Sequence, residues 1–149
     1  MPIFDDVNSQ MKDALRAQQK LRLQALRKIR AGFLLRLKED GSDTLSDEEC
    51  VPILRRLEKQ RRESIEAFDG AGRTEQAAAE RAELEIILAF LPKQADEATT
   101  RAWVESAIAE SGAKSAKDLG RVMGALMKAH KGDVDGNVAR KIASELLPA

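Results

Sequence analysis

The sequence predicts an all-α protein, on three observations. Charged residues make up 34% of the 149-residue chain, whereas aromatic residues make up 3% and tyrosine is absent, a composition that favours helices over strands. Apolar residues recur at spacings of three, four and seven, as they do along one side of a helix. Capping residues and glycine or proline stops separate these amphipathic segments. At this length a folded chain buries about 70% of its extended surface, which is enough for one domain or two small ones.

Residues 46–92 form the clearest part of this pattern, with two helical segments joined by a glycine turn at residues 69–72. Ser46 followed by Glu49 is a capping box, which predicts the start of the first helix. So short a loop predicts that the two helices run antiparallel as a long hairpin. Pro52 predicts either a kink or a later start of the regular helix, because its ring clashes with the preceding turn. The apolar stripes are Cys50, Ile53, Leu54, Leu57, Ser64 and Phe68, then Leu84, Ile87, Leu88 and Leu91.

The segment before the hairpin, residues 3–39, is predicted to be helical throughout. Two helices with a break near residues 17–19 and one bent helix are both compatible with it, because no glycine or proline forces a break. Residues 39–44 are predicted to form a loop. The stripe expected to face the core is Phe4, Val7, Met11, Leu15, Leu26, Ile29 and Phe33.

Three shorter amphipathic helices are predicted after Pro92. Asp96 is placed to cap the first, Ser115 with Asp118 to open the second, and Asp135 to cap the third. We expect them to form a small C-terminal three-helix bundle around Trp103 and the methionines. The predicted domains are therefore an N-terminal helical domain, residues 1–93, and a C-terminal three-helix domain, residues 94–149.

Two groups of basic residues are candidates for contact with nucleic acid. The chain has 25 basic and 25 acidic residues, so local distribution matters more than net charge. At 100° per residue, four cations between residues 20 and 38 fall within about 80°, and four more share one face of the first helix of the hairpin. If both ridges point to the same side, they form a track for phosphates. The ridges are Lys20, Arg27, Arg30 and Lys38, and Arg55, Arg56, Lys59 and Arg62.

A simpler interpretation competes with the phosphate track. Glu58 and Glu66 each lie four residues from Arg62, the spacing of a solvated, salt-bridged helix face, and charge patterning alone favours this interpretation. Arg61 falls on the apolar stripe, and we expect it to pair with an acid of the facing helix such as Glu83.

The sequence shows no catalytic constellation, metal site or cofactor motif. Cys50 and His130 are the single cysteine and the single histidine, so a site built from several imidazoles or thiolates is excluded. We predict that Cys50 packs as a small hydrophobe and that His130 meets the last carbonyls of a helix. With no signal-like start and no run of about 18 apolar residues, a soluble cytoplasmic protein is expected.

Five ordered stretches together resemble the free-standing bacterial proteins of the GatB/YqeY family. They are Lys59–Phe68, Ala71–Arg73, Phe90–Gln94, Asp118–Met127 and Lys131–Gly136. The resemblance implies an all-helical fold with an N-terminal helical part and a C-terminal three-helix part. The family is related to the tail of the B subunit of the amidotransferase that converts misacylated Glu-tRNA or Asp-tRNA, and a similar module is appended to some glutaminyl-tRNA synthetases.

The resemblance implies a non-catalytic module that binds or handles tRNA. It extends the candidate RNA-binding residues to the C-terminal lobe, at Gly120, Arg121, Lys131 and Gly132. The alternative is a protein-interaction module that docks on an aminoacyl-tRNA synthetase or amidotransferase without direct RNA contact. A third, weaker hypothesis is an accessory amidotransferase enzyme, although the family's label of carbon–nitrogen ligase with glutamine as amide donor is inherited by association. We expect no membrane and no metal among the partners.

Overall fold

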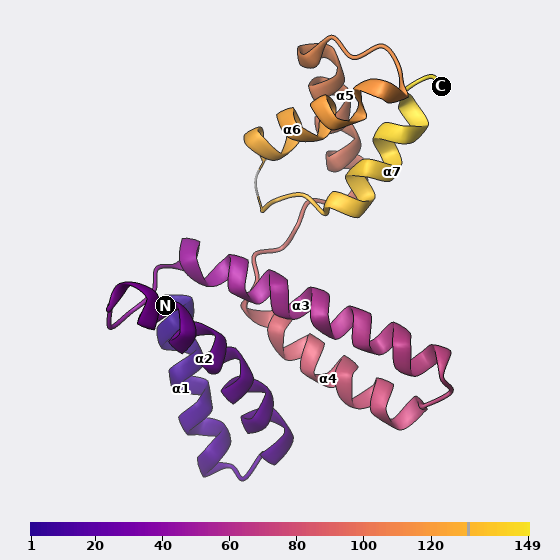
Figure 1. Cartoon of the computed structure of the whole chain (residues 1–149). Coiled ribbons are helices and arrows are strands. Elements are labelled where there is room, and N and C mark those ends of the chain that lie inside the picture. Colours follow the sequence, from indigo (N-terminus) through magenta and orange to yellow (C-terminus); the bar gives the residue numbers. More distant parts are fainter. Residues whose placement is uncertain (131) are drawn as a thin grey trace. The chain divides into compact units, whose positions relative to one another are not determined.

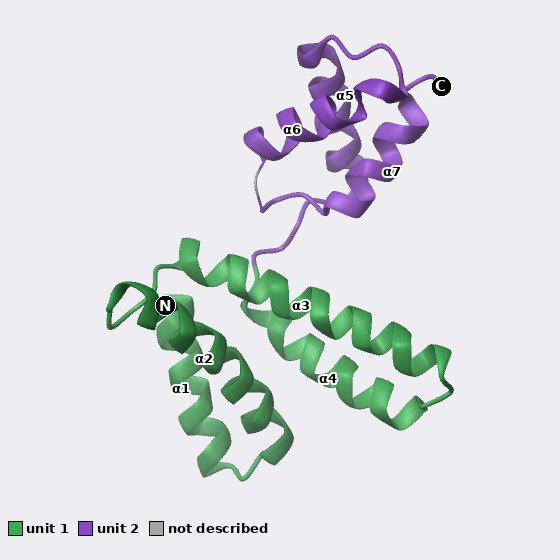
Figure 2. Ribbon diagram, in the orientation of Figure 1, with its two compact units in different colours: residues 1–91 green, residues 92–149 purple. Residues whose placement is uncertain are grey.

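The computed structural model describes residues 1–130 and 132–149. Every regular element in this part of the chain is helical, with seven α-helices and a short 3-10 helix, η1 (Ala116–Asp118) (Figure 1). The predicted all-α class is confirmed. The chain divides into two compact units, residues 1–91 and 92–149, coloured green and purple in Figure 2. Within the described residues, no helix is both long enough and apolar enough to cross a membrane.

The first unit begins with a helical hairpin, α1 (Ile3–Arg16) and α2 (Lys20–Asp40). The alternative with two helices is therefore correct. Gln18 breaks the helix, because its φ of 55° lies in the left-handed region. Leu15 was expected in the core but is 59% exposed. The inward side of α1 is formed by Val7 and Ala14, and Leu15 lies one residue, about 100°, from that side.

The next helix, α3 (Asp47–Gly70), begins where the capping box predicts. The N–H of Glu49 donates to Ser46 Oγ at 3.3 Å, and the N–H of Ser46 donates to Glu49 Oε2 at 3.0 Å. Pro52 lies inside the helix, so the alternative in which the regular helix begins later is wrong. The reciprocal cap stabilises the first turn, upstream of the proline.

Helix α4 (Thr74–Phe90) follows after a short turn and packs along α3 (Figure 1). The buried side chains of α3 all come from its first two turns, where α2 also packs. The last part of α3 therefore contributes no fully buried side chain. The core of this unit contains Val7, Ala14, Leu23, Leu26, Ile29, Phe33, Leu37, Leu45, Cys50, Ile53, Leu54, Ile87 and Phe90.

The second unit contains α5 (Glu97–Ser111), α6 (Leu119–Ala129) and α7 (Gly136–Leu146). The predicted caps of α5 and α7 are confirmed, since Asp96 accepts from the N–H of Thr99 at 2.8 Å and Asp135 accepts from the N–H of Asn137 at 2.9 Å. Ser115 makes no capping bond. The core of this unit contains Val104, Ala107, Val122, Leu126, Val134, Ala139, Ile142, Ala143 and Leu147.

Asp118, predicted with Ser115 to open this helix, is the N-cap residue of α6 but makes no capping bond to it. Its carboxylate accepts from the N–H of Lys114 at 3.0 Å, so it closes the loop before α6. The 3-10 turn η1 separates Ser115 from the first residue of α6, which leaves the serine too far back to reach the orphan N–H groups of that helix.

Candidate nucleic-acid interface

The four basic residues of the first predicted ridge all lie exposed on α2. They are Lys20, Arg27, Arg30 and Lys38. Arg30 donates from Nε to Asn8 Oδ1 of α1 at 3.0 Å. In the described part of the chain, no carboxylate forms an ion pair with Lys20, Arg27, Arg30 or Lys38. These cations therefore keep their charge available to an external anion, in contrast to a salt-bridged helix face.

Helix α1 adds two cations to the same side of the hairpin. The bond between Arg30 and Asn8 shows which flank of α1 meets which flank of α2. At 100° per residue, Lys12 and Arg16 lie within 80° of Asn8 on α1. We name this surface the hairpin basic face. It comprises Lys12, Arg16, Lys20, Arg27 and Arg30, all of them exposed.

The sequence predicted only three of the five cations of the hairpin basic face. Lys12 and Arg16 lie on a different helix from the other three cations, and only the tertiary packing of α1 on α2 unites them. Their spacing of four residues was a usable signal, because it places both on one flank of a helix. Among the described residues of α1 and α2, Asp5 is the one acid on the same flanks by the same helical geometry. The face therefore carries a net positive charge.

The two predicted ridges do not merge into one track. Helix α2 approaches α3 at Gly32, where a Cβ would lie 3.0 Å from Ile53 Cγ2. At 100° per residue, Lys20, Arg27 and Arg30 lie on nearly the opposite side of α2 from Gly32. On α3, Arg55, Lys59 and Arg62 lie about 140–160° from Leu57 and Arg56 lies about 100° from it. Leu57 lines a cavity against α2. Each ridge thus points away from the contact between the two helices.

The ridge on α3 fits the salt-bridge interpretation in part. Arg55 pairs with Glu58 at 3.1 Å, and Arg62 pairs with the other oxygen of Glu58 at 3.2 Å. Arg56 and Lys59 are exposed. One carboxylate therefore serves two of the four cations, and Arg56 and Lys59 remain the stronger candidates for an external anion.

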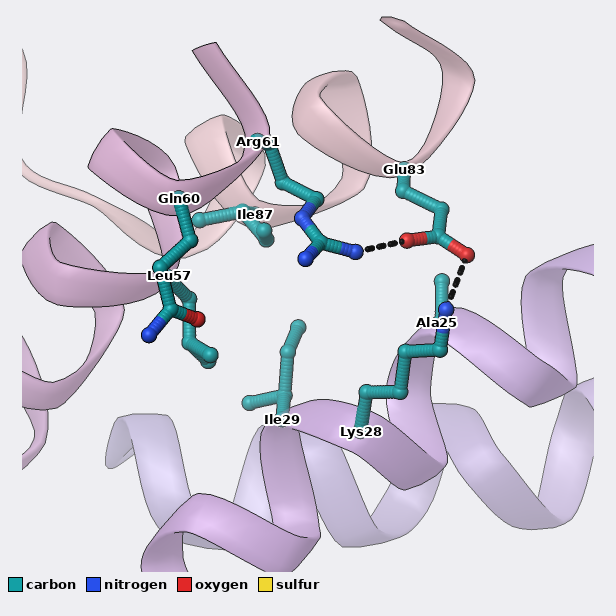
Figure 3. Close-up of a pocket in the computed structure, with 8 residues that line it drawn as sticks. All are labelled: Ala25, Lys28, Ile29, Leu57, Gln60, Arg61, Glu83 and Ile87. Atoms are coloured by element: carbon teal, nitrogen blue, oxygen red, sulfur yellow. Dashed lines mark hydrogen bonds and ion pairs between the residues drawn. The ribbon is translucent and has the colours of Figure 1, made fainter. Parts of the chain in front are cut away.

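Arg61 pairs with Glu83 at 2.9 Å, which confirms the predicted ion pair (Figure 3). The sequence did not indicate two further members of the cluster. Lys28 of α2 reaches the other oxygen of Glu83 at 2.7 Å, and Glu80 lies 3.2 Å from Arg61. Two cations and two carboxylates balance, and the neighbouring cavity of about 260 Å³ is floored by apolar side chains such as Ile29. The cluster therefore joins three helices and offers no excess charge to an anion.

The candidates in the second unit do not form one cluster. Gly120 and Arg121 lie exposed at the start of α6, where Arg121 pairs with Asp118 at 2.9 Å. Gly132 follows the other end of α6 in a turn with φ of 83°. The 11 residues of α6 separate these two places by about 16 Å. Lys131 lies outside the described residues.

The second unit contains an aromatic stack that the sequence does not predict. The rings of Trp103 and His130 lie parallel, with their centroids 3.8 Å apart and 7° between their planes. Both side chains are half-buried. The prediction that His130 sits at a helix end is confirmed, since its N–H donates to the carbonyl of Leu126 at 2.9 Å, but its ring packs on the tryptophan. Spacing along the chain gives no signal for such a contact between α5 and the end of α6.

Groups with catalytic potential are few in the described part of the chain. No three histidine, cysteine, aspartate or glutamate side chains gather there in a way that could hold a metal ion. The Cys50 thiol is buried, as predicted, and burial together with the nearby carboxylates of Asp47 and Glu49 raises its pKa to about 11. A thiol in this state is a poor nucleophile at neutral pH.

The chain was compared with models of protein families and with curated proteins. A family model described as Yqey-like protein matches residues 4–147, almost the whole chain. A search of curated proteins finds no match.

Proposed function

Because the chain belongs to the YqeY-like protein family, we propose that it is a non-catalytic RNA-binding module that handles tRNA. The observation that carries the proposal is the hairpin basic face. Five exposed cations on two packed helices present a charged surface of the kind that neutralises backbone phosphates. The arginines among them add planar donors that match phosphate oxygens in pairs.

Transfer RNA is the favoured ligand because of the resemblance to the amidotransferase B-subunit tail. In this proposal the protein holds the body of a tRNA during tRNA-dependent amidation of Glu or Asp, and the chemistry belongs to other proteins. Arg56 and Lys59 of α3 and the C-terminal candidates Gly120, Arg121 and Gly132 supply secondary contacts. Contacts with the phosphate backbone of an RNA position the molecule without reading its base sequence.

The test is tRNA binding by the full chain, measured across a salt series. Five neutralised phosphates correspond to a slope of about −4 in the logarithm of affinity against that of salt concentration. The double variant Lys20→Glu with Arg27→Glu is expected to abolish measurable binding. Both side chains are exposed, and no carboxylate among the described residues forms an ion pair with them, so the fold is expected to survive.

The matched control is Arg56→Glu with Lys59→Glu, which changes the net charge equally on a different face. We expect it to weaken binding less than the α2 variant. Equal losses from both pairs would contradict the assignment to the hairpin basic face. Absence of wild-type binding at low salt would contradict RNA recognition altogether and favour docking on a synthetase or amidotransferase.

A further inference from the structure

The second unit carries a groove between α6 and α7. Its volume is about 350 Å³, with Met123, Gly124 and Met127 on the side of α6 and Gly136, Asn137 and Arg140 on the side of α7. Met127 is 36% exposed although its side chain is large and apolar. The fold thus leaves the flexible thioether of Met127 open at a concave surface, beside the half-buried Met123. Methionines adapt readily to apolar partners.

The fold of the chain does not require glycine at either of the two glycine positions that line this groove. Neither Gly124 nor Gly136 has a positive φ, and a Cβ built on either would meet no atom within 4 Å. Glycine weakens a helix relative to alanine, so Gly124 in the middle of α6 is unfavourable without a compensating use. What the two residues leave is open space beside exposed backbone. That space lets a second backbone approach closely.

The groove has one lining cation and two flanking ones, against one neighbouring acid, Asp135, whose carboxylate accepts from the N–H of Asn137. Arg140 lines the groove, and by helical geometry Lys128 flanks Met127 on α6 and Lys141 flanks Arg140 on α7. All three cations are exposed, and in the described part of the chain no carboxylate forms an ion pair with them. A partner with acidic residues on either side of an apolar row complements both the floor and the rim.

We propose that this groove docks an acidic amphipathic helix of a partner protein. An apolar row at positions i and i+4 of that helix fills the space beside Met123 and Met127, and its carboxylates reach Arg140, Lys128 and Lys141, as in other helix-in-groove complexes. RNA is the less suitable occupant, because its phosphates have no counterpart in the apolar floor. The inference does not depend on RNA binding by the first unit.

The experiment uses the full chain with ¹³C-methyl methionine and a fluorescein-labelled helical peptide that carries leucines at i, i+4 and i+7 and glutamates on both flanks. The methyl resonances of Met123 and Met127 are expected to shift on titration, while that of Met11 stays in place. Gly124→Leu fills the groove and is expected to weaken binding at least about tenfold, measured by fluorescence anisotropy. This variant is expected to fold, because its new side chain points into open space.

Two controls make the result specific. Ala109→Leu adds similar bulk on an exposed position of α5 and is expected to bind like the wild type. Arg140→Glu is expected to weaken the glutamate peptide and to strengthen a peptide with lysines in place of its glutamates. Unmoved methionine resonances, or wild-type affinity in Gly124→Leu, would overturn the proposal. So would an RNA hairpin that shifts the two methionines when the glutamate peptide does not.

Discussion

Glu83 holds the junction of α2, α3 and α4, and its neutralisation is expected to be costly. Its side chain is nearly buried, and it accepts from Arg61 at 2.9 Å and from Lys28 at 2.7 Å. Glu83→Gln keeps the volume but removes the charge, so Arg61, whose side chain is only 20% exposed, retains Glu80 alone. We expect a loss of about 2–3 kcal/mol in the free energy of unfolding, below the range for a fully buried pair because Arg61 keeps this second carboxylate.

Lys28 provides the contrast, since its side chain is 51% exposed. Lys28→Met is expected to cost less than about 1 kcal/mol. Both values are measured by urea unfolding followed by circular dichroism, and the larger one corresponds to a fall of roughly 10–20 °C in melting temperature for a unit of this size.

A double variant separates the cost of an unpaired charge from the net contribution of the pair. Arg61→Met with Glu83→Leu removes both charges and is expected to recover most of the lost stability, because apolar replacement of a buried pair is often neutral. If Glu83→Gln costs no more than Lys28→Met, the burial of Arg61 and Glu83 does not determine the cost of leaving a charge unpaired at this junction.

Four further predictions concern Gly32, Gly124, Asp96 and Cys50. Gly32→Ala places a Cβ 3.0 Å from a buried side chain of α3 and is expected to lower the free energy of unfolding by about 1 kcal/mol. Gly124→Ala, in open space, is expected to raise it by a similar amount, about 1 kcal/mol, and the opposite sign in either urea titration would refute this account. Hydrogen bonds from the side chain and then the N–H of Thr99 hold the pKa of the Asp96 carboxyl below its ordinary value. The cap therefore contributes stability above the ordinary carboxyl pKa and loses it as pH falls through the lowered value. Trp103 fluorescence in an acid titration is therefore expected to report a smaller loss of stability in Asp96→Asn than in the wild type, and parallel losses would argue against the cap. Burial and a pKa of about 11 protect Cys50, so its reaction with a thiol reagent is expected to need unfolding and to accelerate in step with urea.

Local chemistry made much of the fold predictable. The capping box at Ser46 and the aspartates at positions 96 and 135 act over two or three residues, so the sequence alone identifies them. The break after α1 was left open, because a glutamine in the left-handed region has no marker in the sequence. Ser115 does not cap α6, because the 3-10 turn η1 separates it from the first residue of that helix.

The candidate site was less predictable than the fold. Helical periodicity correctly put Lys20, Arg27 and Arg30 on one exposed ridge, and it identified Arg61 as a residue that needs a partner. It did not indicate that Lys12 and Arg16 share that surface. The helical spacing fixes angles within one helix and leaves open the flank on which the next helix packs.

By itself, the sequence determined the all-α class, most helix ends, the ion pair of Arg61 with Glu83 and the resemblance to the YqeY-like family. Each of these depends on residues close in sequence, on a charge whose burial requires a partner, or on ordered motifs along the chain. The tertiary structure alone decided that the ridges of α2 and α3 point apart, that α1 completes the hairpin basic face, and that Trp103 stacks on His130. Such contacts follow from how helices pack against one another, and packing between distant segments leaves no periodic pattern in the sequence.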